Sequence, residues 1–218
     1  MNKAPILILA SNSPRRRELL ALGGWAFHLD VADINEDVRP GEEPAVYVER
    51  LAREKAQAVL PRCRPGQVIL GADTTVVLDG EILGKPADIA EARTMLIRLR
   101  GRSHQVYTGI AALRTADQAL LSNVCLTQVP MRAYSDAEMD AYIASGDPLD
   151  KAGAYGIQHP DFQPVVDMRG CYASVMGLPL CHLAALLRRL EIHPQADIAA
   201  NCQARLNYAC PIFRSILD

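Results

Sequence analysis

The stretch Ala10-Ser-Asn-Ser-Pro-Arg-Arg-Arg-Glu-Leu-Leu20 directly follows a short apolar run, residues 6–10. The apolar run predicts a strand, and Ser13 and Pro14 are typical of the N-cap and the first residue of a helix. The arginines at 15–17 then fall in the first helical turn, where the positive end of the helix dipole disfavours cations. A bound anion would remove this conflict, because exposed N–H groups, the dipole and the guanidinium groups would all face it. We therefore favour an anion-binding site here over the alternative, a solvated basic patch.

The composition limits the class of protein. Half of the 218 residues are apolar, which is enough for a core in one domain or two small ones. The net charge of −2 and the 5% aromatic content indicate no nucleic-acid-binding face, and no apolar run reaches the length of a membrane span. We expect a soluble, cytoplasmic protein that binds neither nucleic acid nor a membrane.

The cysteines and histidines give no sign of a metal site at the level of spacing. The six cysteines form no C-x-x-C motif and no zinc-like pairing with histidine, so we expect free thiols. Cys202 and Cys210 could still pair with each other, since both lie near the end of the chain. The five histidines are interpreted as surface or core residues.

The periodicity of apolar residues and the turn signals predict a mixture of strands and helices. We expect strands at 6–10, 27–31, 68–78, 81–86, 105–113 and 120–133, a hairpin near 165–175, and helices at 14–22, 44–60, 89–100, 136–144 and 179–190. The third of these helices should bury a stripe formed by Ile89, Ala92, Leu96 and Leu99. The Gly-, Asp- and Pro-rich segment 145–158 has the composition of a recognition loop.

Two charged residues fall where apolar ones are expected. Lys55 lies on the apolar stripe of its helix, where it could extend outward along its methylene stem or reach inward to an anion. Asp73 lies within the β-prone run 68–78, and an unpaired carboxylate in a buried strand is costly. It could be tied to backbone N–H groups at a strand end, but we favour a metal ligand or a general base.

Together these residues suit phosphoryl chemistry. A triphosphate site needs cations for the phosphates and carboxylates for a magnesium ion. The candidates are Arg15, Arg16, Lys55 and Lys85 for the phosphates, and Glu36 and Asp73 for the metal. They come from five segments, each near the predicted end of an element, which suits a cleft between two lobes. The sequence contains no serine-hydrolase elbow, Walker A motif or dinucleotide-binding fingerprint.

Several motifs resemble those of the Maf family of nucleoside triphosphate pyrophosphatases. They are LASNSPRR at 9–16, RLAREKA at 50–56, GADT at 71–74 with GKP at 84–86, DKAGAYGIQ at 150–158 and VMGLPL at 175–180. The resemblance covers roughly residues 5–190 in unbroken order, which is far more specific than any single motif. It divides the chain into a domain at 1–190 and a tail at 191–218, which could dock on the domain, bind a partner or stay mobile.

The resemblance implies an α/β fold that is elongated, two-lobed and built on a mixed sheet, like that of inosine triphosphate pyrophosphatases, with a central cleft. It implies hydrolysis of a nucleoside triphosphate to the monophosphate and pyrophosphate by attack on the α-phosphorus. A divalent cation, Mg²⁺ or Mn²⁺, would assist, and a homodimer is possible. Within the family, the motifs resemble the branch that acts on dTTP and UTP and, in some members, on modified pyrimidine nucleotides.

The resemblance also implies roles for single residues. Asp73 matches the proton acceptor and, with Glu36, the metal-binding acids; Ser11, Arg15, Arg16, Lys55 and Lys85 match phosphate-binding positions; Arg15, Thr74 and Gln158 match positions associated with base choice. The Gln158 amide offers a donor and an acceptor to the imide edge of uracil or thymine. Arg17 is expected to face solvent, because successive helical positions point in different directions.

Two alternatives remain open at the level of sequence. One is a 7-methyl-GTP pyrophosphatase of the same family, and the other is a nucleotide-binding regulator of cell division without turnover. The acids Glu36 and Asp73 favour an enzyme, because a protein that only binds nucleotides would not need both.

Overall fold

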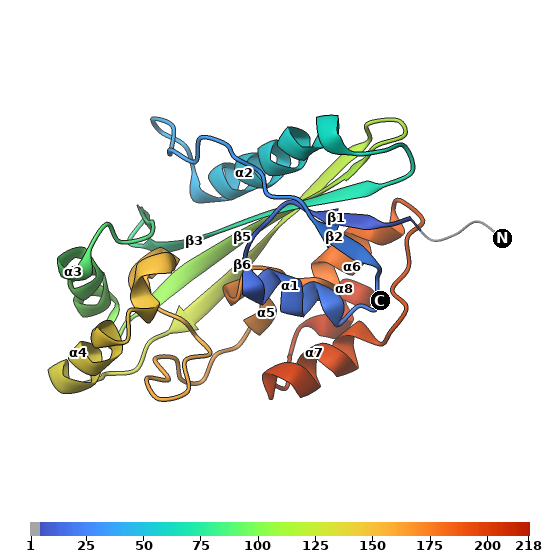
Figure 1. The fold of residues 1–218 in the computed structure, drawn as a ribbon. Coiled ribbons are helices and arrows are strands. Elements are labelled where there is room, and N and C mark those ends of the chain that lie inside the picture. The colour runs from blue at the N-terminus through green and yellow to red at the C-terminus, as the bar shows by residue number, and fades with distance from the viewer. Residues whose placement is uncertain (1–4) are drawn as a thin grey trace.

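The computed structural model describes residues 5–218 and contains, within them, one mixed sheet of six strands (Figure 1). The strands are β1 (Leu7–Leu9), β2 (Phe27–Leu29), β3 (Val68–Leu78), β4 (Glu81–Leu83), β5 (Ser103–Arg114) and β6 (Leu120–Pro130). Their order is β2-β1-β3-β5-β6, with β4 paired to β3. Strand β1 runs parallel to β2 and β3, whereas the β3, β5 and β6 pairings are antiparallel. The predicted mixed α/β fold class is confirmed.

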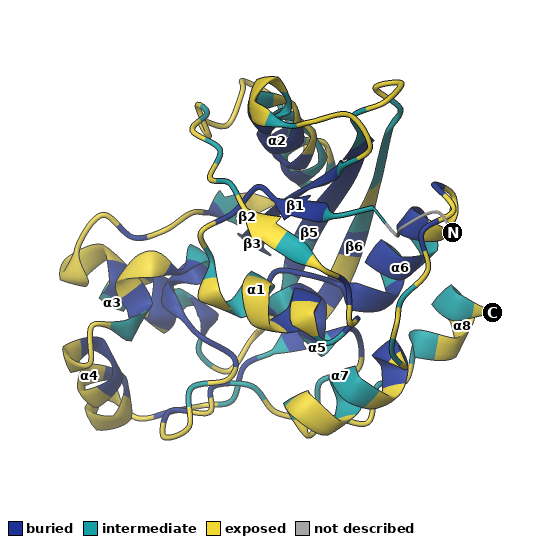
Figure 2. Cartoon of the chain, turned by 45° about the vertical axis from the view of Figure 1, so that its right-hand side comes forward, coloured by how far each residue is buried: buried dark blue, intermediate teal, exposed yellow. Residues whose placement is uncertain are grey.

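Eight α-helices surround this sheet in the described part of the chain. They are α1 (Pro14–Ala21), α2 (Pro44–Val59), α3 (Ile89–Leu99), α4 (Asp136–Ala144), α5 (Tyr172–Val175), α6 (Leu180–Arg188), α7 (Ile198–Leu206) and α8 (Phe213–Leu217). Helix α2 covers one face of the sheet, and α1, α5 and α6 lie on the other side (Figures 1 and 2). Helices α6, α7 and α8 lie toward one end of the long strands, and α3 and α4 lie toward the other (Figure 1). This separation gives the molecule its two lobes. No helix within residues 5–218 is long and apolar enough to cross a membrane.

Helices α1, α2, α3 and α4 begin at the residues that the sequence predicts, whereas α5, α7 and α8 were not predicted. The Ser13 side chain accepts a hydrogen bond from Arg16 N at 3.4 Å, and Pro14 occupies the first helical position. Ser135 and Glu138 form the predicted capping box at the start of α4. These local signals depend on neighbouring residues only, which is why they can be identified without the fold.

Helix α2 packs against the sheet with no side chain between them at two points. A Cβ atom built on Gly71 in β3 would lie 1.9 Å from the carbonyl oxygen of Ala52, and one on Gly109 in β5 would lie 2.3 Å from that of Val48. Real Cβ atoms cannot approach backbone so closely, so glycine is required at both positions. The close approach brings the buried face of α2, which includes Lys55, directly over β3 (Figure 2).

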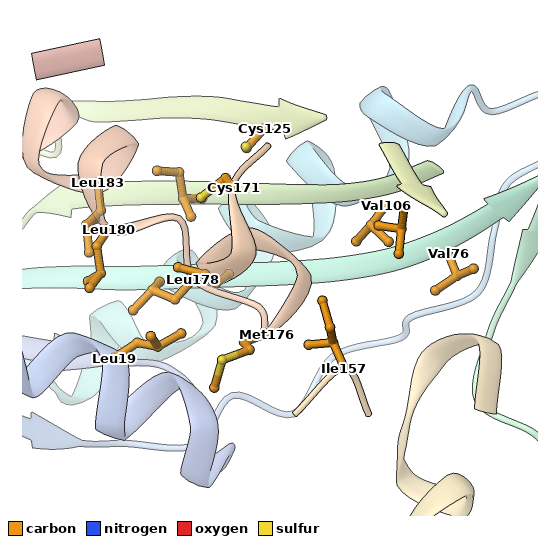
Figure 3. Packing of buried hydrophobic residues seen from close by; sticks show 14 of the residues in the cluster. Leu19, Val76, Val106, Cys125, Ile157, Cys171, Met176, Leu178, Leu180 and Leu183 are labelled. Carbon is orange, nitrogen blue, oxygen red and sulfur yellow. The ribbon is translucent and has the colours of Figure 1, made fainter. Parts of the chain in front are cut away.

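Most of the core lies on the opposite face of the sheet. Figure 3 shows part of this cluster, in which Leu178, Leu180 and Leu183 pack against one face of the strands. A smaller cluster, which includes Ile8 and Ala56, fills the space under α2. Both faces of the central strands are therefore buried. This is expected for strands whose sequences are almost continuously apolar and do not alternate between apolar and polar residues.

The tail at 191–218 docks on the rest of the protein. Trp25 Nε1 donates a hydrogen bond to the carbonyl oxygen of His193 at 3.1 Å, and Asn201 Nδ2 donates one to Leu22 O at 3.0 Å. The hydroxyl of Tyr208 donates to the carbonyl oxygen of Met168 at 3.1 Å. Ile198 is 3% exposed. Of the possibilities that the sequence leaves open, packing on the same chain is the one observed.

Some predictions about the elements are wrong. Residues 165–175 do not form a hairpin: Val165 makes an isolated bridge to Met131, and the segment from Tyr172 is helix α5. Asp167, with a positive φ of 48°, breaks the extended backbone between them. Ile89 is 60% exposed, and Met95 takes its expected place in the buried stripe of α3. Strand β6 ends at Pro130, which has no N–H group to donate to a neighbouring strand.

His104 makes folding stability depend on pH. The ring is 2% exposed, and burial lowers the pKa of His104 to about 4, whereas an unfolded histidine titrates near 6.5. Between pH 6.5 and pH 4 the imidazole is protonated in the unfolded chain but neutral in the folded protein, so the free energy of unfolding falls as pH falls. We expect His104 to lower the free energy of unfolding by about 2–3 kcal/mol as the pH falls from 7 to 4.5. Urea unfolding at both pH values should show a smaller difference for His104→Gln, and an unchanged difference would contradict the assignment.

Candidate active site

A cleft of about 650 Å³ brings together every site residue that the sequence analysis proposed. Its walls include Ser11, Arg15, Arg16, Glu36, Lys55, Asp73, Thr74, Lys85 and Gln158. These residues come from the loop after β1, from α1, from the loop before α2, from α2 itself, from β3, from the segment after β4 and from the loop before α5. The predicted convergence of distant cations and acids is therefore observed.

Lys55 lies between the two acids. Its Nζ is 2.7 Å from Asp73 Oδ1 and 2.8 Å from Glu36 Oε1, and its side chain is only 9% exposed. The alternative that Lys55 extends outward to solvent is therefore wrong. The reason is that Lys55 lies on the buried face of α2, which packs against β3.

Asp73 lies in the middle of β3, opposite Gly109 of β5, and not at a strand end. Lys55 likewise lies within α2 and not at its end. The expectation that every candidate lies near the end of an element is therefore wrong for Asp73 and Lys55. Asp73 accepts a hydrogen bond from the Lys55 ammonium. A buried carboxylate needs such a charged partner to offset the loss of its hydration. Burial raises the pKa of Asp73, and the charges of Lys55 and Arg16 only partly oppose this effect.

Glu36 lies in the loop between β2 and α2, with its side chain half exposed. The hydroxyl of Tyr47 donates to the Glu36 carbonyl oxygen at 2.9 Å and so fixes the loop on α2. Partial burial would raise the pKa of Glu36, but the hydrogen bond and charge of Lys55 outweigh it and hold the pKa below its usual value. Because both acids bind one ammonium, their carboxylate oxygens face a common point that could hold a cation.

Arg16 connects three segments of the cleft wall. Its Nε donates to the carbonyl oxygen of Gly177 at 2.9 Å, its Nη1 to Ser11 Oγ at 3.3 Å and its Nη2 to Thr74 Oγ1 at 3.4 Å. Burial lowers the pKa of the Arg16 guanidinium, which nevertheless stays charged. The guanidinium is thereby held beside the N-terminus of α1.

The other two arginines differ from Arg16. Arg15 lines the cleft and lies 3.8 Å from the Asp150 carboxylate, which belongs to the loop before α5. Arg17 is exposed, as predicted from its position on the helix. The first turn of α1 contains no acidic residue to balance the arginines.

Lys85 and Gln158 lie at the rim of the cleft. Both residues are exposed, and the charge of Lys85 contributes to the lowered pKa of Glu36. Thr74 lies deeper, next to Asp73, and its Oγ1 is 3.0 Å from that of Thr108. The cleft therefore has a charged interior and a polar rim.

Three further residues of the cleft were not singled out from the sequence: Tyr47, Asp150 and Lys151. Lys151 is buried, and its Nζ donates to Asp147 Oδ1 at 2.8 Å and to Asp150 Oδ1 at 2.6 Å. The DKAGAYGIQ motif contains Asp150 and Lys151. It therefore predicted that this segment belongs to the site, but it did not show which of its side chains line the cleft. No local signal identifies Tyr47, whose contact with Glu36 depends on the fold.

A second cavity of about 900 Å³ adjoins the cleft and shares Arg15, Ile157, Gln158 and Met176 with it. Its outer wall comes from the tail, at Arg205, Leu206, Asn207 and Tyr208. No tail residue lines the cleft itself within the described part of the chain. The tail therefore borders the site without blocking it.

Comparison with known proteins places these features in a family. Residues 6–190 match the family model described as Maf-like protein. The chain is 52% identical over 188 residues to the dTTP/UTP pyrophosphatase of Anaeromyxobacter dehalogenans, which covers 85% of this chain and 94% of that protein. It is 50% identical over 184 residues to the dTTP/UTP pyrophosphatase of Myxococcus xanthus, which covers 84% of this chain and 92% of that protein. Among solved structures, the Staphylococcus aureus Ham1 protein matches with a TM-score of 0.45 and 15% identity, over 73% of this chain and 79% of that one. The family match ends where the tail begins, and the protein belongs to the Maf family.

Proposed function

We propose that this protein hydrolyses nucleoside triphosphates, with dTTP and UTP as the preferred substrates, to the monophosphate and pyrophosphate. The observation that carries the proposal is the cleft in which Arg16 and Lys55 converge with Glu36 and Asp73. The names of the relatives described above support the same reaction and the same pyrimidine nucleotides.

The cations would bind the triphosphate. The N-terminus of α1 offers backbone N–H groups and the positive end of its dipole, and Arg15 and Arg16 lie in its first turn. Lys85, in the segment after β4, lines the same cleft. Such a cluster of fixed positive groups is suited to a phosphate chain, whose charge it neutralises.

Glu36 and Asp73 would hold the divalent cation. Both offer carboxylate oxygens, the ligands that Mg²⁺ and Mn²⁺ prefer, and both already face one cationic atom, Lys55 Nζ. When bound, such an ion neutralises phosphate charge and lowers the pKa of a coordinated water. The donor set therefore fits the proposed cofactor.

Asp73 would accept the proton of the attacking water. Its pKa is raised by burial, and a general base works best with a pKa closer to the operating pH. The charge of Lys55 favours the ionised carboxylate, and its hydrogen bond at 2.7 Å fixes the orientation of the carboxylate. Water that loses its proton to Asp73 would attack the α-phosphorus, and pyrophosphate would leave.

Base selection would involve Arg15 and Thr74 inside the cleft and Gln158 at its rim. A hydrogen-bonding pocket rejects the wrong base strongly, because its polar groups then stay unpaired. We expect Gln158→Ala to lower kcat/KM for dTTP by about 10–100-fold, with a smaller effect on a poorly accepted base. Gln57→Ala, exposed on α2, is the matched control and should leave kcat/KM unchanged.

The test is phosphate release from dTTP, UTP and 7-methyl-GTP in the presence of Mg²⁺ or Mn²⁺ and added inorganic pyrophosphatase. Faster turnover of 7-methyl-GTP than of dTTP would contradict the pyrimidine preference. Binding of dTTP without any turnover would favour the nucleotide-binding regulator instead. The cytoplasmic location, the homodimer, the division into 1–190 and 191–218 and the absence of a nucleic-acid partner stay predictions from the sequence.

A further inference from the structure

A group of metal-ligating side chains lies outside the cleft. Cys125 of β6, Cys171 just before α5 and His182 of α6 each place one ligand atom within 4.8 Å of the other two. Both cysteines are buried, and Figure 3 shows their side chains near each other against one face of the sheet. The spacing of these residues along the chain gave no sign of this arrangement, because three separate elements build it.

His182 supplies an independent observation. Its Nδ1 atom is buried and, within residues 5–218, has no hydrogen-bond partner. Burying a polar nitrogen without a partner costs about 1–3 kcal/mol, so native proteins rarely leave one in this state. A ligand coordinated by this nitrogen would remove that cost.

The donor set selects the ligand. Two thiols and an imidazole are typical ligands of zinc, whereas Mg²⁺ and Mn²⁺ prefer oxygen. Tetrahedral zinc with bond lengths of about 2.3 Å to sulfur and about 2.0 Å to nitrogen separates its ligand atoms by roughly 3.5–3.8 Å. The three atoms would therefore need to approach each other only slightly.

We propose that Cys125, Cys171 and His182 bind one zinc ion. A further thiol stands beside the site, since Cys210 Sγ in the tail lies 4.0 Å from the carbonyl oxygen of Gly170, the residue before Cys171. The site is distinct from the proposed magnesium position between Glu36 and Asp73, because its ligands are sulfur and nitrogen and it lies under the sheet.

The ion would join β6, α5 and α6 at one point. The residue that links this point to the cleft is Ser174, whose hydroxyl donates to Cys171 O at 2.9 Å and whose carbonyl oxygen accepts from Thr108 at 2.7 Å. Gly177, three residues further on, accepts the hydrogen bond from Arg16. Zinc would thus stabilise the segment that holds the Arg16 guanidinium, and its role is structural.

The experiment uses the full chain, purified under reducing conditions and titrated with Co²⁺ and then Zn²⁺. Ligation by thiolate gives Co²⁺ a charge-transfer absorption that carboxylates cannot produce, so binding at Glu36 and Asp73 does not contribute. We expect one equivalent of Co²⁺ to produce this band, Zn²⁺ to remove it by displacement, and Zn²⁺ to raise the melting temperature.

Two ligand variants and one control make the result specific. Cys125→Ser and His182→Gln should each weaken Zn²⁺ binding by about tenfold or more and abolish the rise in melting temperature. Cys63→Ser removes a thiol on the other side of the sheet, near α2, and should behave like the wild type. A wild-type protein without the Co²⁺ band, or a band that persists in both folded ligand variants, would overturn the proposal. Freshly purified protein with a Cys125–Cys171 disulfide and no bound zinc would overturn it too, in favour of a redox pair.

Discussion

Replacing Asp73 by asparagine is expected to lower kcat for dTTP hydrolysis by about 10²–10⁴-fold, the usual contribution of a general base. Asparagine keeps the shape of the side chain but can neither accept the proton of water nor balance the Lys55 charge. Binding of dTTP should change less than turnover, because Arg15, Arg16 and Lys85 are untouched. Phosphate release measured over a range of nucleotide concentrations separates kcat from KM.

The pH profile makes this test sharper. Burial raises the pKa of Asp73, so the carboxyl group is protonated, and inactive as a base, at acidic pH. The wild-type rate should therefore fall on the acid side, and the residual rate of the variant should lack that limb. Asp79→Asn, in the exposed turn after β3, is the matched control and should keep full activity. An Asp73→Asn enzyme with wild-type kcat would show that the proposed mechanism is wrong.

Replacing Gly71 by alanine is expected to destabilise the protein by about 3 kcal/mol or more, at or beyond the upper end of typical overpacking costs. The new Cβ would lie 1.9 Å from Ala52 O and 3.0 Å from Ala56 N, and both atoms belong to the backbone of α2. Helix α2 would have to move away from the sheet, and Lys55 would move away from Asp73 with it. Thermal and urea unfolding measure the stability, and failure to obtain folded protein agrees with the prediction.

Gly84→Ala is the control for stability, because a Cβ at this position meets no atom within 4 Å. It should melt close to the wild type. A Gly71→Ala protein that melts within about a degree of the wild type would mean that α2 does not rest directly on β3.

How much of the fold the sequence predicts depends on the range of the interactions involved. The capping box of α4 and the β3–β4 hairpin at Asp79 and Gly80 depend on neighbouring residues, and the predicted elements are confirmed. The hairpin predicted near 165–175 is wrong, because apolar residues there contact distant parts of the chain instead of one another. Val165, for example, bridges to Met131.

The candidate site shows the same limit. The sequence and its resemblance to a family identified the cations Arg15, Arg16, Lys55 and Lys85 and the acids Glu36 and Asp73, but not Asp150 and Lys151, which line the same cleft. They could not show that Lys55 lies between two carboxylates, because this depends on how closely α2 approaches β3. The sequence could not predict the group formed by Cys125, Cys171 and His182 either, because three segments that are distant along the chain meet there only in the folded protein.

The three hydrogen bonds of Arg16 have a consequence for the thermodynamics of ligand binding. Restricting a mobile, rotamer-rich side chain at a binding interface costs about 0.5–1.5 kcal/mol. Residues of the protein itself, Ser11, Thr74 and Gly177, already restrict Arg16, so folding has met that entropic cost. An anion that arrives at α1 thus encounters a preorganised guanidinium, and less of its interaction energy is lost to conformational ordering.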